Sequence, residues 1–263
     1  MLQRLILYCV ALTFPLAGCG DGPAGPADGT ASVSVSFSTA SGSAASAVSA
    51  DGPLFSMAAL DVIGTNGTLS LDGVWFIVDE LELERTEVDC DDAPDEDACE
   101  EFEAPRRFVD LPLEGGAALT VSETVPLGAY EELEFEIEDG EVDDDEDDAT
   151  EIAALLAEIR ALHADWPAGA SMLVTGSFTP AGGASVGFRV FFEAEVEIEL
   201  DFDPPLVVEG DGTVTVVVDP SLWFTSPDGS VVDLSGFDFA TTGTLVELEV
   251  EMENGFTEIE FED

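Results

Sequence analysis

Hydrophobic and polar residues alternate one by one along several segments, which is the pattern of a β-strand with one buried face. Leu133, Phe135 and Ile137 alternate with glutamates, and the pattern recurs at residues 193–199 and 247–253. A period of two places apolar side chains on one face of a sheet and carboxylates on the other. We therefore expect strands that pack on a core through one face and present glutamate on the opposite face.

Other strand patterns are separated by glycine- and proline-containing turns such as Pro126–Ala129 and Pro180–Gly183. One segment has a different period, because Ile152, Leu155 and Ile159 fall on one face of an amphipathic helix that ends before Trp166. Many short strands with one helix predict a mainly β fold, an antiparallel β-sandwich with one short α-helix. The predicted strands cover residues 74–87, 107–111, 117–125, 130–138, 171–179, 186–201, 213–219, 230–234, 244–252 and 256–261.

The N-terminus carries a basic residue followed by about ten apolar residues, which is too short a stretch to cross roughly 30 Å of hydrocarbon as a helix. This arrangement is typical of a secretory signal. Leu16–Cys19 resembles the lipobox of bacterial lipoproteins. The resemblance implies cleavage before Cys19, a diacylglyceryl group on its sulfur and an acyl chain on the new amino terminus. The alternative is an ordinary signal peptide with an incidental cysteine.

Composition divides the chain into three parts. We expect a lipoprotein signal peptide at residues 1–18, a lipidated cysteine with a flexible Gly/Ala/Ser/Pro tether at 19–55, and an acidic β-sandwich domain at 56–263. Within the tether, residues 32–38 alternate strictly and are interpreted as a first strand that docks on the domain. Gly20 stands where enterobacterial lipoproteins retained in the inner membrane carry aspartate, so by analogy we expect the outer membrane.

Charge excludes one class of function. The chain has 58 acidic residues against six basic ones, for a formal net charge of −52. Such a charge repels phosphate backbones and therefore excludes nucleic-acid binding. It favours cations, high salt or a basic partner. Carboxylates that face one another on neighbouring strands destabilise the pair by roughly 0.2–1 kcal/mol, so something must relieve that repulsion.

Cys90 and Cys99 are the cysteines that remain once Cys9 and Cys19 are assigned to the signal and the anchor. Export would place them in an oxidising compartment, where a Cys90–Cys99 disulfide would close a short acidic loop. A metal site is the alternative, but it needs more soft ligands and the chain has one histidine, His163.

Calcium is the candidate cofactor. Asp143, Asp145 and Asp147 keep the one-three-five spacing of an EF-hand loop, but Asp148 replaces its glycine and Ala154 its final glutamate. The acidic runs at 89–103 and 138–148 can still gather carboxylates around a hard cation in another geometry. The alternative is a solvated acidic surface suited to saline surroundings.

Two further motifs carry weaker hypotheses. Gly183–Gly187 matches the G-x-S-x-G pattern of hydrolases, but it falls in a predicted hairpin and His163 precedes it, opposite to the order that pattern requires. Trp223 and Phe224 would stack on a sugar ring if they were exposed, as would Trp75, which gives a carbohydrate-binding alternative. Neither pattern favours an enzyme.

Four segments resemble an uncharacterised group of bacterial lipoproteins with a β-sandwich domain, over most of residues 70–263. The resemblance implies the β-sandwich fold and attachment to the cell envelope, and it implies no catalytic residues. We therefore expect a lipid-anchored protein of the cell envelope with a non-catalytic binding or structural module, dependent on calcium or salt, whose partner is an envelope protein or a glycan. The segments are Phe108–Leu113, Val125–Tyr130, Val174–Phe178 and Val217–Phe224.

Overall fold

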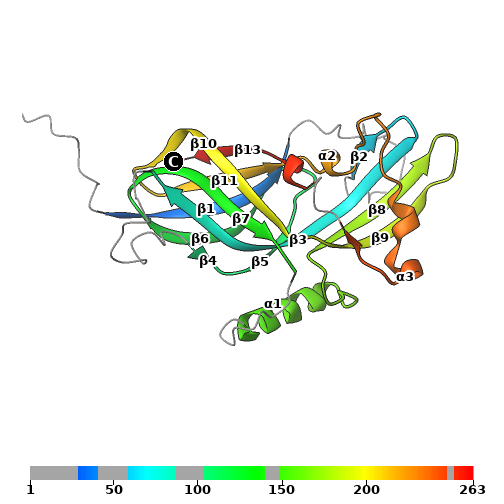
Figure 1. Ribbon diagram of the computed structural model, residues 1–263, viewed down its shortest axis with the longest axis horizontal. Helices are drawn as coiled ribbons and strands as arrows, with labels where there is room; N and C mark the ends of the chain where they lie inside the picture. Colours follow the sequence, from blue (N-terminus) through cyan, green and yellow to red (C-terminus); the bar gives the residue numbers. More distant parts are fainter. Residues whose placement is uncertain (1–28, 41–58, 87–102, 140–148, 248–251, 263) are drawn as a thin grey trace, which may run out of the picture.

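The computed structural model describes residues 29–40, 59–86, 103–139, 149–247 and 252–262 (Figure 1). These residues form an elongated, mainly β fold made of two sheets, with few and short helices. The predicted fold class is confirmed. Among the described residues, no helix is both long and apolar enough to cross a membrane.

The smaller sheet contains four strands in the order β13 (Phe256–Glu262), β11 (Gly212–Val218), β1 (Thr30–Thr39) and β6 (Ala117–Pro126). The strand predicted at residues 32–38 is therefore present. It lies in the interior of its sheet, parallel to β11 and antiparallel to β6. Its inward side chains Val33, Val35 and Phe37 are fully buried, because strict alternation gives the strand one entirely apolar face. The sandwich thus includes residues that precede the expected domain start at 56.

The larger sheet is organised along β3 (Gly67–Arg85), whose 19 residues extend along much of the molecule. β3 pairs with β8 through residues 67–76 and with β7 through residues 78–85. The other strands of this sheet are β2 (Leu60–Ile63), β4 (Glu103–Ala104), β5 (Arg107–Asp110), β7 (Gly128–Ile137), β8 (Met172–Pro180), β9 (Val186–Glu193), β10 (Val196–Val208) and β12 (Val246–Glu247).

The main core lies between the two sheets. Phe37 of β1 makes edge-to-face contacts with Phe76 of β3 and Phe135 of β7, with ring centroids 5.5 and 5.4 Å apart. Phe256 of β13 packs on both Phe76 and Phe135. Aromatic pairs of this geometry stabilise a core beyond the area that they bury. Residues far apart in sequence therefore meet at the centre of the sandwich.

A second core lies on the outer face of the larger sheet, under the helix α1 (Ala149–Leu162). The predicted helix is confirmed. Ile159 packs against Ile77, Leu173 and Phe191 from three strands, and all four side chains are fully buried. The outer face of this sheet is therefore apolar where α1 covers it.

Two predicted strands have different boundaries. The strand expected at 186–201 is divided into β9 and β10, with a break at residues 194–195. The strand expected at 244–252 is reduced to β12, and residues 248–251 lie outside the described part of the chain.

The strand predicted at residues 230–234 is wrong. Val231 makes only an isolated bridge to Thr225, and the 3-10 helix η3 (Leu234–Phe237) begins directly afterwards. The side chains of Asp228 and Asp233 accept hydrogen bonds from backbone N–H groups two residues later, which favours turns over an extended strand. The other short helices are α2 (Pro220–Trp223), α3 (Phe239–Thr242) and η4 (Glu253–Gly255).

Candidate functional site

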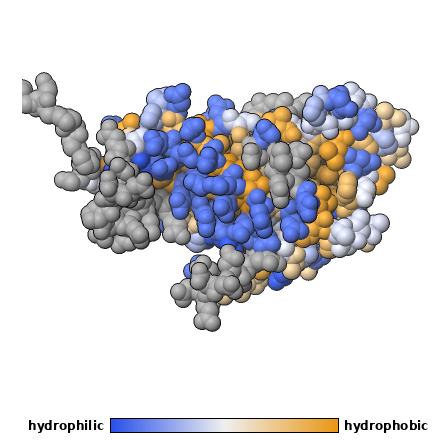
Figure 2. All heavy atoms as spheres, viewed as in Figure 1, coloured by the Kyte–Doolittle hydropathy of each residue, from blue (hydrophilic) through white to orange (hydrophobic). Residues whose placement is uncertain are grey.

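Three neighbouring strands align their carboxylates on the outer face of the larger sheet. β7 lies between β10 and β3, so each of its outward glutamates is paired with a carboxylate on both sides. Figure 2 shows hydrophilic residues gathered over this half of the molecule. We call the nine residues the carboxylate ladder, and its three rows are Asp79–Glu136–Glu197, Glu82–Glu134–Glu199 and Glu84–Glu132–Asp201.

A bulge in β3 brings its carboxylates to the correct face. Glu80 has a backbone φ of 45°, the one positive value at a non-glycine residue in the described part of the chain. The pairing with β7 shifts between Asp79 and Glu82, so that Val78 and Leu81 both point into the core. Asp79 therefore shares the outer face with Glu82, whereas strict alternation would place them on opposite faces.

The pKa values of the central glutamates of the ladder are raised above their usual range. Burial raises the pKa of Glu134 to about 7, helped by a hydrogen bond with Glu197 and by the charges of Glu197, Glu82 and Glu132. Burial and the surrounding carboxylates also raise the pKa values of Glu132 and Glu136. At neutral pH the ladder therefore has to hold protons or attract counter-ions.

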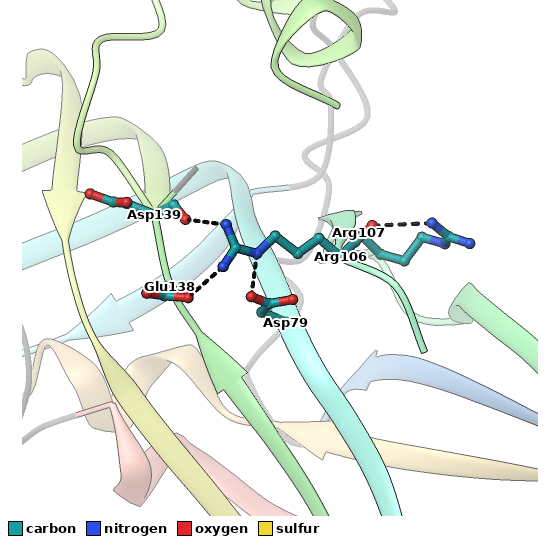
Figure 3. A network of polar contacts seen from close by, with 5 residues as sticks. All are labelled: Asp79, Arg106, Arg107, Glu138 and Asp139. Carbon is teal, nitrogen blue, oxygen red and sulfur yellow. Dashed lines mark hydrogen bonds and ion pairs between the residues drawn. The ribbon is translucent and has the colours of Figure 1, made fainter. Parts of the chain in front are cut away.

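Arg106, just before β5, neutralises one end of the ladder (Figure 3). Its Nε donates to the Asp79 carboxylate, and its Nη2 donates to Oε2 of Glu138 at 2.9 Å. Its Nη1 lies 3.5 Å from the backbone carbonyl oxygen of Asp139. Burial nevertheless raises the pKa of Glu138 to about 7, although the Arg106 charge acts in the opposite direction. One guanidinium thus joins β3, β7 and the segment before β5.

A different polar cluster lies at the end of α1, which we call the histidine cluster: His163, Asp165 and Arg189. Arg189 of β9 donates from Nε and Nη2 to the two Asp165 carboxylate oxygens, at 2.8 and 2.9 Å. Its Nη2 also lies 3.3 Å from Nδ1 of His163. The His163 ring packs on Trp75 of β3, with centroids 4.7 Å apart, and on Phe108 of β5 at 5.9 Å.

Neighbouring charges act on both titratable members of this cluster. Burial lowers the pKa of His163, and the Arg189 charge lowers it further, against the opposite effects of Asp165 and Asp110. Burial raises the pKa of Asp165, but the hydrogen bonds and charge of Arg189 outweigh it, so that the pKa falls below its usual range. The arginine and the carboxylate are therefore engaged with each other, which is the arrangement of a structural ion pair.

The predicted site residues have different outcomes. Cys19, the pair Cys90 and Cys99, and the candidate calcium ligands Asp143, Asp145 and Asp147 lie outside the described residues. Within the described ranges, no group of three histidine, cysteine, aspartate or glutamate side chains is arranged to hold a metal ion.

The sugar-stacking hypothesis for Trp223 and Phe224 is wrong. Both side chains are about 1% exposed, and the Trp223 indole N–H donates to the backbone carbonyl of Met252 at 2.9 Å. Trp75 is half-buried, and its ring lies edge to face with His163 at a centroid distance of 4.7 Å. Ser185 of the hydrolase-like motif lies in the exposed turn between β8 and β9, without the strand-to-helix elbow that a nucleophilic serine needs.

Comparison with protein-family models, with curated proteins and with solved structures found no match. The candidate site therefore stands on the geometry of the ladder and of the two arginine-centred clusters. Sequence reasoning missed both clusters. The available signal was the scarcity of basic residues, because six arginines among 58 carboxylates are each expected to be paired.

Proposed function

We propose that this chain is an exported lipoprotein of the cell envelope whose acidic β-sandwich is a non-catalytic binding or structural module adapted to cation-rich surroundings. The observation that supports the proposal is the carboxylate ladder. Nine carboxylates lie in three rows across three strands, and Arg106 neutralises one end only.

The ladder makes folding dependent on screening. Side chains directly opposite on neighbouring strands have Cβ atoms about 4.5–5.5 Å apart, and like charges there cost roughly 0.2–1 kcal/mol per pair. Six opposed pairs act on one face. Dissolved cations reduce this repulsion because salt shortens the distance over which surface charges interact. A domain built in this way is expected to be most stable in saline surroundings.

Screening by many cations explains the ladder better than one bound calcium ion does. The ladder residues project from regular strands, whereas calcium sites wrap six to eight oxygens around one point. The calcium hypothesis for Asp143, Asp145 and Asp147 is a separate proposal about residues outside the described part of the chain. The same experiment addresses both.

Thermal unfolding of the mature chain, residues 20–263 without lipid, tests the proposal. The melting temperature should rise with sodium chloride, and calcium chloride at matched ionic strength should raise it equally. A much larger effect of calcium would instead establish a specific divalent site. A melting temperature that does not depend on either salt would contradict the proposed adaptation.

Matched variants attribute the effect to the ladder. Glu132→Gln, Glu134→Gln and Glu136→Gln together remove three charges from its centre. Glu258→Gln, Glu260→Gln and Glu262→Gln together remove three charges from β13, where they are paired with Val217, Thr215 and Thr213. The ladder variant should be stabilised in low salt and lose most of its salt dependence, and the β13 variant should keep it.

The anchor part of the proposal rests on the lipobox-like Leu16–Cys19 and on the fold. Since β1 begins at Thr30, about ten residues separate the proposed lipidated Cys19 from the sandwich. We propose that these residues act as a flexible tether, for which that length gives a root-mean-square extension of roughly 15–20 Å. We propose that the domain is held close to an outer-membrane surface and meets an envelope protein or a glycan there.

A further inference from the structure

Helix α1 is attached to the sheet by few side chains. Ile152 and Ile159 are its buried residues, Leu155 and Leu156 pack partly buried against the apolar cluster on the sheet, and Leu162 in its last turn is 72% exposed. Figure 1 shows the helix on the outside of the strands, away from the main core. The contacts at its C-terminal end add to this attachment.

His163 supplies those contacts. Its backbone N–H donates to the carbonyl oxygen of Ile159 at 2.7 Å and so closes the last turn of the helix. Its ring packs on Trp75 of β3, Phe108 of β5 and Trp166 of the following loop. His163 therefore ties the end of α1 to several elements at once.

The hydrogen-bond geometry requires a neutral imidazole. Arg189 can only donate, so Nδ1 of His163 has to accept from the guanidinium and the proton of the neutral ring is on Nε2. A proton added to Nδ1 would place a second donor and a second positive charge 3.3 Å from the Arg189 nitrogen. That hydrogen bond cannot then form.

We propose that His163 is a pH-sensitive catch, which fixes the end of α1 to the larger sheet while the imidazole is neutral and releases it on protonation. Release uncovers the apolar surface of Ile77, Leu173 and Phe191. Between neutral pH and mild acid, the domain would thus exchange a covered face for an open apolar one.

The charged groups around His163 determine how readily its imidazole is protonated. Arg189 of β9 opposes protonation, while Asp165 of the following loop and Asp110 of β5 favour it. Asp165 is already held by both nitrogens of the Arg189 fork, which limits its help to an imidazolium. On α1 itself, Arg160 lies with its Nε 3.4 Å from the Trp166 carbonyl. The lowered pKa of His163 agrees with this balance, since burial and Arg189 disfavour the charged ring.

The single histidine makes the experiment direct. NMR of the mature chain follows the imidazole resonances of His163 without assignment, because no other histidine contributes. Hydrogen exchange of the α1 amides is measured over the same pH range and corrected for the intrinsic rate. Strand β11, which carries no titratable side chain and belongs to the smaller sheet, serves as the internal reference.

We expect protection of the α1 amides to fall about tenfold relative to β11 as His163 becomes protonated, and the two midpoints should coincide. His163→Gln keeps an uncharged side chain at every pH and should abolish that pH dependence. Protection of α1 that is unchanged across the titration would overturn the proposal. So would a loss of equal size in His163→Gln.

The wild-type measurement decides the matter even if His163→Gln does not fold. Coincidence of the two midpoints supports the catch, and α1 opening at a different pH overturns it. Glu134→Gln separates the catch from the ladder, because it alters ladder titration and leaves the histidine cluster intact. If Glu134→Gln shifts the pH at which α1 opens while the titration of His163 stays unchanged, the proposal is also contradicted.

Discussion

Glu134 on β7 and Glu197 on β10 share a hydrogen bond between two carboxyl groups, which requires that one of them holds a proton. The pair lies at the middle of the carboxylate ladder, where burial raises the pKa of Glu134 to about 7 from a usual value of 4.5. Between these two values the folded protein binds more protons than the unfolded chain. Stability from this pair is therefore gained as the pH falls and is lost as the pH rises through about 7.

The first prediction follows from this direction of the dependence of stability on pH. In low salt, the wild-type domain should gain stability between about pH 8 and pH 6, and Glu134→Gln should gain less over the same interval. Melting temperatures at constant ionic strength measure both. Glu258→Gln, outside the ladder, is the control and should behave as the wild type. The opposite sign, with higher wild-type stability at the higher pH, would contradict the ladder electrostatics.

Arg106 should be essential to the end of the ladder that it neutralises. Arg106→Gln leaves Asp79 and Glu138 without their guanidinium, and loss of a charged hydrogen-bond partner from a buried site costs about 1–3 kcal/mol. Chemical denaturation measures the loss. Arg107→Gln removes the neighbouring charge, whose side chain bonds only the Arg106 carbonyl among the described contacts, and should cost much less. Equal losses of stability in the two variants would show that the overall charge, and not the contact of Arg106 with Asp79 and Glu138, determines the effect.

Phe37 should be among the most sensitive core positions. Phe37→Ala removes a fully buried ring in edge-to-face contact with Phe76 and Phe135, and such truncations cost about 3–5 kcal/mol. Leu119→Ala on the neighbouring β6 is the matched control, because Leu119 is 68% exposed. That control should change stability by roughly 0.5 kcal/mol or less. Denaturant titration distinguishes the two results.

Strand β1 should be indispensable even though it lies before the expected domain boundary. A chain that begins at residue 41 lacks the strand between β6 and β11, so both would expose unpaired edges and an open core. We expect this chain to aggregate or to unfold without cooperativity, whereas residues 20–263 should unfold cooperatively. Calorimetry compares them. Added peptide 29–40 should restore part of the transition, and a cooperative transition without it would refute the role of β1.

Lipidation at Cys19 should account for membrane attachment. The net charge of −52 repels anionic lipid, so Cys19→Ser should yield exported protein that remains in the soluble fraction. Mass spectrometry of the wild-type N-terminus checks for the acyl groups. Membrane association of the processed Cys19→Ser variant would contradict an anchor at this residue.

The strands of the ladder could be predicted from the sequence because hydrophobic and polar residues alternate along them. The alignment of carboxylates into rows across the three strands could not. Glu134 faces Glu82 only because a bulge at Glu80 shifts the register of β3, and local alternation carries no sign of it. The same limit applies to Arg189 and His163, which belong to different elements and meet through the packing of α1 on the sheet. Long-range register and packing decide such contacts.

The incorrect predictions from the sequence have local causes. Residues 230–234 have strand-like composition, yet the aspartates at 228 and 233 bind backbone N–H groups two residues later and turn the chain. Trp223 follows a turn-like Asp219–Pro220, but its ring is directed into the core, where Met252 accepts its N–H. Sequence alone does not tell which face of a short helix is covered.

The position of β1 determines when the sandwich can close. β1 is synthesised near the start of the chain, but Val33 of β1 is paired with Gly212 of β11, which is made only when about four fifths of the chain exists. Chains are synthesised from the N-terminus, and contacts of high sequence separation form slowly. The smaller sheet therefore cannot be completed during most of synthesis. Until β11 is available, one edge of β1 has no native partner strand, although Phe76 and Phe135, which pack on Phe37 of β1, have already been made, and an unpaired strand edge can pair with another chain.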